Sequence, residues 1–407
     1  MMHTQNAEGQ WPAISYERLP WERNADELAL ISKRQRRRIA PTYEAAVPLA
    51  IAQRPIAIPS DLSERISDTL ARAVRFDESL AAKPFDVPAL ILRSESAASS
   101  QIERLTSSAR NIALAGISSK APANAQLIAN NVDAMRMALS LPDAIDEAHI
   151  RTIHGALMGE SQPDIAGKLR REQVWIGGTP YSPHGALFVP PNWKNIGDLL
   201  ADLSLCANRD DLNPVVKAAL VHAQFETIHP FVDGNGRTGR TLLHKVLKSE
   251  GVLRHTTLPI SAGLLHNIDE YLAALQKYQQ GNPLAVVEQL VDALDNALYL
   301  GAVASELIET ALDRWRTTMT ERAGSKIHEL PNVLAAQPVV NSSYVANALG
   351  ITQRAATSLI NRACEYGILR PMGARERGDF YQADDMLEIL EQMGSVESIR
   401  RLRTKGV

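Results

Sequence analysis

A twelve-residue segment, His229 to Arg240, constrains this chain most, because it must end one helix and begin another across a glycine-rich turn. The stretch before it has apolar residues at helical spacing and stops at Pro230, which disfavours helical backbone in the residue that precedes it. The stretch after it predicts a second helix, whose buried stripe consists of Leu242, Leu243, Val246 and Leu247. The segment, HPFVDGNGRTGR, therefore predicts a helix–loop–helix unit.

The composition of this loop predicts a phosphate site. Gly234, Gly236 and Gly239 allow sharp bends and a close approach of the backbone to a ligand. The N–H groups and the dipole at the start of the following helix favour an anion. Arg237 and Arg240, three residues apart, add two guanidinium groups that suit a polyphosphate.

Two more residues of the segment predict a metal ligand and a base. Asp233 lies beside the predicted anion site, and a carboxylate next to bound phosphates is a common way of holding Mg²⁺. His229 carries the only side chain of the segment that can act as a base near neutral pH. A purely structural turn would explain each of these elements alone. Their combination within twelve residues favours a functional site.

The segment also resembles, at every position, the active-site motif HPFx[D/E]GNGRxxR of the Fic family of protein adenylyltransferases. The resemblance implies that His229 deprotonates a Ser, Thr or Tyr hydroxyl of a target protein, which attacks the α-phosphate of ATP. AMP is transferred and pyrophosphate leaves, while Asp233 holds Mg²⁺ and Arg240 reaches the γ-phosphate. The nucleotide-binding residues that the resemblance implies are Asp233, Gly234, Asn235, Gly236, Arg237, Thr238, Gly239, Arg240, Tyr271 and Gln279.

A β-rich stretch, Gln173 to Pro191, interrupts an otherwise helical neighbourhood. Val174–Ile176 and Leu187–Val189 predict two short paired strands around a loop. The stretch resembles the flap of Fic proteins, which lies over the active site and where a target segment docks by adding a strand. The docking residues that the resemblance implies are Ile176, Gly177, Gly178, Phe188 and Val189. A surface excursion without a role is the alternative.

Ser99 and Glu103 form a second motif, four residues apart on one face of a predicted helix. They resemble the [S/T]xxxE pattern, followed by Gly or Asn, of Fic proteins that carry an N-terminal inhibitory helix. Arg104 departs from this pattern. The resemblance implies that Glu103 pairs with Arg240 and removes the cation that should hold the γ-phosphate. A solvated glutamate on a partly exposed helix is the alternative.

The tail from about Ser325 predicts a winged helix-turn-helix, with helices at Ser343–Leu349 and Gln353–Tyr366. Strands follow at Ile368–Arg370 and Phe380–Tyr381. Residues that could reach DNA from this tail are Gln353, Arg354, Ser358, Asn361, Arg362, Arg375 and Arg377. Since the tail has no dense basic stripe, we favour a structural or protein-contact role over DNA contact.

The chain as a whole, with 407 residues and few aromatic residues, predicts two or three domains and helices packed on helices. We expect an all-α fold: a Fic helical core with a small β-hairpin flap and a C-terminal winged helix-turn-helix domain. The expected segments are 1–125 with the inhibitory helix, 126–310 as the catalytic core, and 325–400 as the winged helix.

Charge and apolar patterning narrow the class of protein further. The net charge of −3 gives no general attraction to nucleic acid or to anionic membranes. No apolar stretch suits a signal peptide or a membrane span, so we expect a cytoplasmic protein without membrane contact. Cys206 and Cys364 have no CxxC partner and are expected to stay reduced. The basic run Lys33–Arg38 predicts a solvated helix end or loop.

Together these patterns predict an enzyme that transfers AMP from ATP, with Mg²⁺, to a hydroxyl of a target protein or of itself. Its expected partners are ATP and the target, and the resemblance leaves a homodimer open. Transfer of UMP or phosphate, or removal of AMP, on the same site is one alternative. A winged-helix transcription regulator with a vestigial core is the other.

Overall fold

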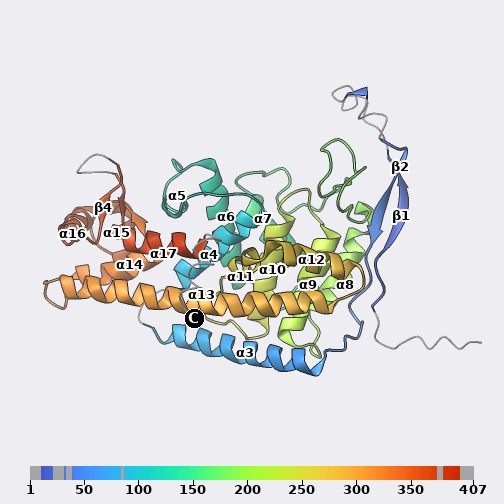
Figure 1. Cartoon of the computed structure of the whole chain (residues 1–407). Helices are drawn as coiled ribbons and strands as arrows, with labels where there is room; N and C mark the ends of the chain where they lie inside the picture. The colour runs from blue at the N-terminus through green and yellow to red at the C-terminus, as the bar shows by residue number, and fades with distance from the viewer. Residues whose placement is uncertain (1–10, 22–31, 34–38, 84–86, 374–378, 395–407) are drawn as a thin grey trace, which may run out of the picture. The chain divides into compact units, whose positions relative to one another are not determined.

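The computed structural model describes residues 11–21, 32–33, 39–83, 87–373 and 379–394 (Figure 1). It is mainly helical with a few short strands, which confirms the predicted fold class. The chain divides into two compact units, each assembled from three stretches. Unit one contains Met1–Ser63, Ser140–Ser249 and Glu270–Gln289, and unit two contains Glu64–Leu139, Glu250–Asp269 and Leu290–Val407. The three successive segments expected from the sequence stay a prediction.

Unit one is built around helix α9, Pro214–Ile228, which is buried on nearly every side. It packs against α10, Asn235–Ser249, and α8, Ile196–Ala207, while α7, Glu147–Met158, packs against α8 and α10. The short helix η1, Trp193–Asn195, leads into α8. The helix starts are capped locally. Asn213 accepts the N–H of Val215, with Pro214 as the first residue of α9, and Asp146 accepts the N–H of His149 at α7.

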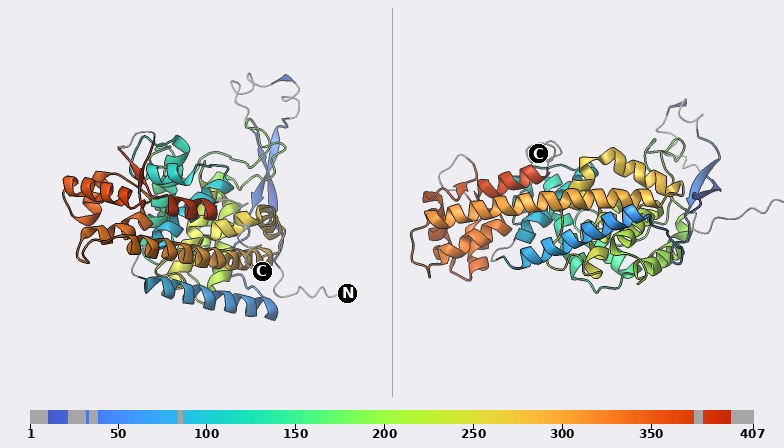
Figure 2. Two further views of the ribbon diagram at one scale, coloured as in Figure 1. Left: turned by 60° about the vertical axis from the view of Figure 1, so that its left-hand side comes forward. Right: turned by 60° about the horizontal axis from the view of Figure 1, so that its bottom comes forward.

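A two-stranded antiparallel ribbon also belongs to unit one. Strands β1, Ser15–Pro20, and β2, Thr42–Val47, pair from Ser15 opposite Val47 to Pro20 opposite Thr42. The views in Figures 1 and 2 show the ribbon standing out from the helices of its unit. The sequence pattern does not predict it, because neither strand has a clean alternation of buried and exposed residues. Of the basic run, Lys33 is described and Arg34–Arg38 lie outside the described residues.

Unit two contains two long helices that lie side by side, α3, Ser60–Ala81, and α13, Leu284–Thr318 (Figures 1 and 2). Their first residues belong to unit one. Ion pairs join them, among them Arg65 to Asp292 at 2.6 Å. Shorter helices complete the unit before the tail: α4, Val87–Ile102; α5, Ala109–Ala115; α6, Ala123–Ser140; and α11, Ile260–His266. Helix α12, Ile268–Gln279, runs from unit two into unit one.

The tail forms the remaining part of unit two. Its elements are η2, Lys326–Glu329; α14, Leu330–Ala336; β3, Val339–Val340; α15, Ser342–Leu349; α16, Gln353–Glu365; β4, Arg370–Pro371; β5, Tyr381–Gln382; and α17, Asp384–Gly394. The strands make an antiparallel sheet in the order β3-β5-β4. Both helices expected for a winged helix are present within one residue, and the two expected strands shift by one or two residues. The winged-helix assignment itself stays a prediction.

The side chains of the tail favour a structural role. Arg362, expected to reach DNA, donates to Glu321 at 2.7 Å and lies over the ring of Tyr366 at 4.7 Å. Arg375 and Arg377 lie outside the described residues. The apolar core of the tail is continuous with residues of α3, α4, α5 and α13, so the tail shares the core of unit two. In the described part of the chain, no helix combines the length and apolarity that a membrane crossing requires.

The close packing of α9 on α10 depends on Gly239. A methyl group there would lie 2.5 Å from Oε1 of Glu226 and 2.9 Å from the ring of Phe225. We therefore expect Gly239→Ala to lower the free energy of unfolding by about 1–3 kcal/mol through overpacking. Gly197 in α8 is the matched control, since no atom lies within 4 Å of its added methyl group. Gly197→Ala should be neutral or slightly stabilising in the same urea titration, and equal losses in both variants would contradict the packing argument.

Candidate active site

The candidate site starts at His229, where α9 ends in left-handed backbone with φ 50° and ψ 61°. Residues other than glycine rarely adopt this conformation, and such strain often marks a functional position. Its ring Nδ1 lies 3.3 Å from the carbonyl oxygen of Glu226. Because a carbonyl only accepts, this contact requires the proton on Nδ1 and places the lone pair of the neutral ring on Nε2. This geometry is compatible with a base, and the catalytic role of His229 stays a prediction.

The loop after His229 is closed by the side chain of Asn235. Its Oδ1 accepts the N–H of Phe231 and its Nδ2 donates to the oxygen of Phe231, both at 2.9 Å. The amide group therefore shapes the loop, and its contact with a nucleotide stays a prediction. Gly234, with φ 76°, precedes α10, and the N–H of Thr238 closes the first helical turn onto its oxygen at 3.0 Å. The first N–H groups of α10 have no partner within the helix, as an anion site requires, and nucleotide binding here stays a prediction.

Asp233 lies at the solvent-exposed rim of this anion site. Its Oδ1 accepts the N–H of Gly234 at 2.7 Å, and its Oδ2 accepts the side-chain amide of Gln162 at 3.0 Å. Each carboxylate oxygen keeps a further lone pair. A single carboxylate beside phosphate oxygens matches the preference of Mg²⁺ for a few protein oxygens, so these residues fit the predicted metal.

The two arginines of the loop lie one turn apart on α10 and are both buried, with 5% of Arg237 and 2% of Arg240 exposed. The Nη2 atom of Arg237 lies 3.8 Å from the sulfur of Met158. Since charge in the interior is costly, both guanidinium groups need polar partners at this depth. Their contact with a polyphosphate stays a prediction.

The two residues expected near an adenine ring, Tyr271 and Gln279, both lie on α12. Tyr271 is buried, and its hydroxyl is 2.9 Å from Nε2 of His222. Burial lowers the pKa of His222 to about 4, so this histidine is neutral and acts as a hydrogen-bonding core residue. Gln279 is half-buried, and its carbonyl oxygen accepts the N–H of Ile14. Contact with adenine stays a prediction for both residues.

His154, which the sequence pattern does not single out, supports the loop from α7. Its ring stacks on Phe231 with 3.7 Å between the ring centres. The N–H of Gly167 donates to Nδ1 at 2.9 Å, so the proton lies on Nε2, which donates to the oxygen of Asp233 at 3.0 Å. Burial lowers the pKa of His154 to about 4. A neutral His154 therefore fixes both the ring of Phe231 and the backbone of Asp233.

Arg170 is the second supporting residue that sequence spacing does not reveal. Its buried guanidinium group donates to the oxygen of His229 at 2.8 Å, of Glu172 at 3.0 Å and of Pro191 at 2.6 Å. Glu172 directly precedes the predicted flap, and Pro191 is its last residue. Burial lowers the pKa of Arg170 to about 10, which leaves it charged at neutral pH. Arg170 thus joins both ends of the flap to the backbone of the base.

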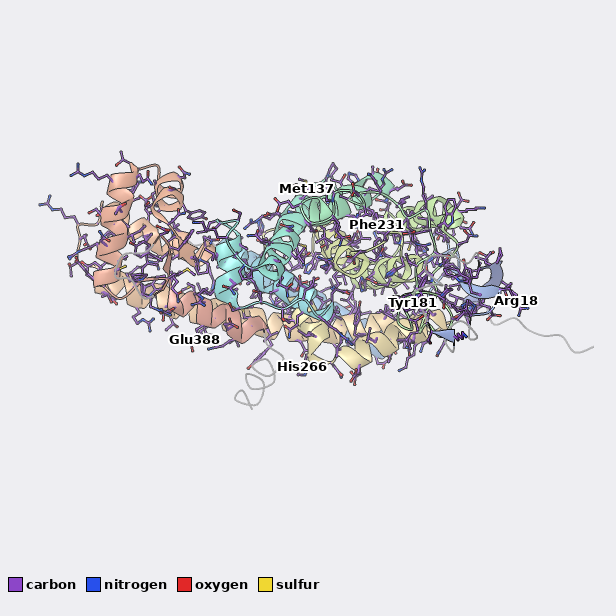
Figure 3. The ribbon with its side chains drawn as sticks, turned by 90° about the horizontal axis from the view of Figure 1, so that it is seen from above. Arg18, Met137, Tyr181, Phe231, His266 and Glu388 are labelled. Atoms are coloured by element: carbon purple, nitrogen blue, oxygen red, sulfur yellow. The ribbon has the colours of Figure 1, made fainter. Side chains whose placement is uncertain are left out.

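The flap pairs at Ile176 and Phe188, which form an antiparallel bridge, and again at Thr179 and Ser182. These are isolated bridges instead of the two short strands expected. The physical reason lies in Gly177 and Gly178, both with φ 75°, which turn the chain directly after Ile176. In unit one Phe231 lies among the helices, and Tyr181 marks the flap (Figure 3).

The β1–β2 ribbon covers one side of the flap. The N–H of Ala46 donates to the oxygen of Val189 at 2.9 Å, and the ring of Trp21 meets Trp175 edge-on at 5.7 Å. Phe188 is hydrogen-bonded to Ile176 on one side, and Val189 is hydrogen-bonded to Ala46 of β2 on the other. The segment Phe188–Val189 of the flap therefore lies between Ile176 and β2. Across the described ranges, the main chains of Trp175 and Gly177 make no backbone–backbone hydrogen bond. The outer edge of the flap can therefore receive a further strand.

The Ser99–Glu103 motif lies in unit two, at the end of α4. The helix ends at Ile102, so the expectation of two residues on one helical face is wrong for Glu103, which is exposed in the turn. Arg104 has φ 61°. The N–H of Arg104 donates to the carbonyl oxygen of Gln101, and the N–H of Leu105 donates to the carbonyl oxygen of Ser100. These two hydrogen bonds form the Schellman motif of a helix end.

Residues 144–247 match the model of the Fic/DOC family. This range contains the flap and the whole loop from His229 to Arg240. The match supports a Fic domain in this part of the chain.

Two relatives carry the name protein adenylyltransferase. The chain is 31% identical over 164 residues to fic-1 of Caenorhabditis elegans, covering 40% of this chain and 30% of that protein. It is 36% identical over 105 residues to Fic of Drosophila virilis, covering 25% of this chain and 20% of that protein. The chain thus spans less than a third of the length of these relatives.

A crystal structure of a Fic family protein from Desulfovibrio desulfuricans is similar in fold. Its TM-score is 0.52 at 21% sequence identity, and the match covers 81% of this chain and 98% of that chain. This similarity extends beyond residues 144–247 and shows a shared fold.

The two buried histidines predict how stability depends on pH. Both have a folded-state pKa of about 4, below the usual 6.5, so the unfolded chain binds more protons between these values. Each histidine should therefore remove stability as the pH falls from 6.5 to 4, by up to about 3 kcal/mol. In His222→Gln, the slope of the unfolding free energy against pH should drop by up to about 1.4 kcal/mol per pH unit in this window. An unchanged slope would mean that His222 is not held neutral.

The turn at Arg104 predicts a stabilising substitution. Left-handed backbone costs a residue with a side chain about 1 kcal/mol relative to glycine. Arg104→Gly should therefore raise the free energy of unfolding of unit two by about 1 kcal/mol in a urea titration. Arg110→Gly, inside α5, is the control and should destabilise by a similar amount. A loss of stability in Arg104→Gly would contradict the left-handed turn.

Proposed function

We propose that this chain is a protein adenylyltransferase, which transfers AMP from ATP to a Ser, Thr or Tyr hydroxyl of a target protein and of itself. The observation that carries the proposal is the placement of His229, with its lone pair on Nε2, directly before the anion site at the start of α10. The match of residues 144–247 to the Fic/DOC family and the names of the relatives support it.

The hydroxyl oxygen of the target attacks the α-phosphorus of ATP and passes its proton to Nε2 of His229. The bond from the α-phosphorus to the bridging oxygen of the β-phosphate breaks, and pyrophosphate leaves. The N–H groups of α10, with Arg237 and Arg240, bind the phosphates. When bound at Asp233, Mg²⁺ would offset the negative charge that collects on the leaving pyrophosphate.

Two surfaces support a protein as the acceptor. The edge of the flap at Trp175 and Gly177 offers main-chain groups that any extended segment can pair with. A groove of about 760 Å³ lies beside the exposed Val232 of the loop, and exposed cations line it, among them Lys168, Arg171 and Lys194. The volume lies in the usual range of ligand pockets, so the groove has room for a few side chains of an extended segment.

We further propose that Glu103 restrains this activity by pairing with Arg240. The capped turn after α4 supports the idea, because its two hydrogen bonds fix the backbone on both sides of Glu103. A carboxylate on Arg240 would occupy the guanidinium group that the γ-phosphate needs, so ATP would bind in a pose unsuited to attack. DNA contact through the tail and a homodimer are not needed for this function.

His229→Ala tests the transfer step directly. Loss of the base should reduce labelling by α-labelled ATP at least about 100-fold, the lower range for general-base catalysis. His255→Ala, a partly exposed histidine of unit two, should label like the wild type. Mass spectrometry of the product should show a gain of one AMP. A gain of phosphate or UMP, or full labelling by His229→Ala, would overturn the proposal.

The restraint is tested by two substitutions of one residue. Glu103→Gly and Glu103→Gln both remove the carboxylate, and each should raise AMP transfer about tenfold or more if the carboxylate competes with the γ-phosphate. Glu64→Gln, on the exposed side of α3, controls for the loss of one negative charge. If neither Glu103 variant transfers AMP at a higher initial rate than Glu64→Gln, Glu103 is not inhibitory.

A further inference from the structure

A cavity of about 200 Å³ lies inside unit two, beside the end of α4. Residues of α4, the turn after it, α5, α6 and α17 line it. An apolar cavity of about 150 Å³ is large enough to bind benzene. This cavity therefore has room for a small organic molecule, and the nature of its walls decides which kind.

Ser94 gives the first indication of a ligand. It lines the cavity from α4 and is 1% exposed, and its hydroxyl has no hydrogen-bond partner among the residues that the structure describes. A buried hydroxyl without a partner costs free energy, and a serine in a helix ordinarily avoids this by bonding to a carbonyl of the preceding turn. The unused hydroxyl of Ser94 can donate to an acceptor inside the cavity.

Arg93, next to Ser94, lines the same cavity and is 6% exposed. Its guanidinium group donates to the oxygen of Ala336 at 3.2 Å and to the side-chain oxygen of Gln337, both of which are neutral. Within the described ranges, no carboxylate lies within ion-pair distance of Arg93. A buried cation without an anion is unfavourable, so this wall favours a ligand that brings a negative charge.

The rest of the cavity wall combines apolar side chains with polar Gln101, Thr106 and Ser107 and one carboxylate. Leu105, Ile112, Ile128 and Leu390 supply apolar surface. Glu391 also lines the cavity, from α17, and accepts the N–H of Ala109 at 2.8 Å. A plain anion would be repelled by Glu391, whereas a ligand with both charges would be attracted at each end.

We propose that this cavity binds a small zwitterion of the amino-acid class with an apolar side chain. Its carboxylate would pair with Arg93 and accept the hydroxyl proton of Ser94, while its ammonium group pairs with Glu391. Its apolar side chain packs against Leu105 and Ile112. An amino acid of the size of leucine suits the volume.

The same site suggests a control over transfer, a step that rests on the proposed function. Gln101 and Leu105 line the cavity, and both take part in the turn that holds Glu103. A ligand packed against Leu105 stabilises this turn in the observed geometry, because binding to the folded form opposes its opening. Ligand binding should therefore strengthen the restraint by Glu103.

Binding is measured by titration calorimetry on the full chain, with L-leucine as the probe. Two matched compounds each lack one charge: 4-methylpentanoate has no ammonium group and isopentylamine has no carboxylate. L-Leucine should bind and raise the melting temperature, and each matched compound should bind at least tenfold more weakly. Equal binding of 4-methylpentanoate would overturn the amino-acid class, and no heat with L-leucine would overturn the site.

Three variants locate the binding. Ser94→Ala should weaken L-leucine binding about fivefold or more while the protein keeps its melting temperature. Ala97→Leu places a larger side chain into the cavity and should abolish binding. Ser79→Ala, which removes an exposed hydroxyl of α3, should bind like the wild type. If Ser94→Ala and Ala97→Leu both bind L-leucine as the wild type does, the ligand lies elsewhere and the proposal fails.

The control over transfer has its own measurement. L-Leucine should lower AMP transfer by the wild type, and Glu103→Gly should bind L-leucine yet transfer AMP at an unchanged rate. If L-leucine binds but does not change AMP transfer by the wild type, the proposed coupling is wrong and the proposed binding site still holds. Failure of the proposed function would show as labelling that does not depend on His229, while calorimetry would still report the cavity.

Discussion

The left-handed backbone of His229 is the constraint on which the candidate site depends. It ends α9, turns the chain toward α10 and brings the ring over the carbonyl of Glu226. A residue with a side chain costs about 1–3 kcal/mol in such backbone, so the surroundings must hold it. Arg170 does so at the oxygen of His229, and Asn235 closes the loop at Phe231. His229 and the start of α10 are thus the two ends of one turn that these contacts hold in place.

The contacts that hold this turn depend on the charge states of two buried side chains, His154 and Arg170. His154 is neutral, since burial lowers its pKa to about 4, and this allows its ring to accept from Gly167 and to donate to Asp233. A second proton on the ring would remove the acceptor and break the first of these bonds. Arg170 stays charged, and its guanidinium group donates hydrogen bonds to main-chain oxygens. Neutral and charged supports together fix the backbone, while the carboxylate of Asp233 stays exposed to solvent.

Local features of this fold could be predicted from the sequence. The loop at His229 could be located because glycine, proline and two flanking helical patterns lie within a short stretch. The helices of the tail could be predicted equally well, since Thr352 caps α16 and Gly350 ends α15. In each case the residues that decide the structure are neighbours in the chain.

Features that depend on distant residues could not be predicted in this way. The β1–β2 ribbon has no clear alternation, and its relation to the flap rests on Ala46 and Val189, far apart in the chain. His154 and Arg170 act on residues 59 to 79 positions away, with no spacing that would mark them. Their roles became apparent only when the fold brought them to the loop.

The end of α4 shows how a local pattern can be recognised and still be placed on the wrong element. The spacing of Ser99 and Glu103 suits one helical face, yet the backbone leaves the helix at Ile102. The position after Glu103 then requires left-handed backbone, and here it carries Arg104 with φ 61°. Glycine and asparagine, which the resembling pattern has at this position, are the residues that adopt such backbone most readily. The turn therefore explains why that pattern has glycine or asparagine after the glutamate. The helix end sets the conformation of Glu103 as much as any partner of its carboxylate does.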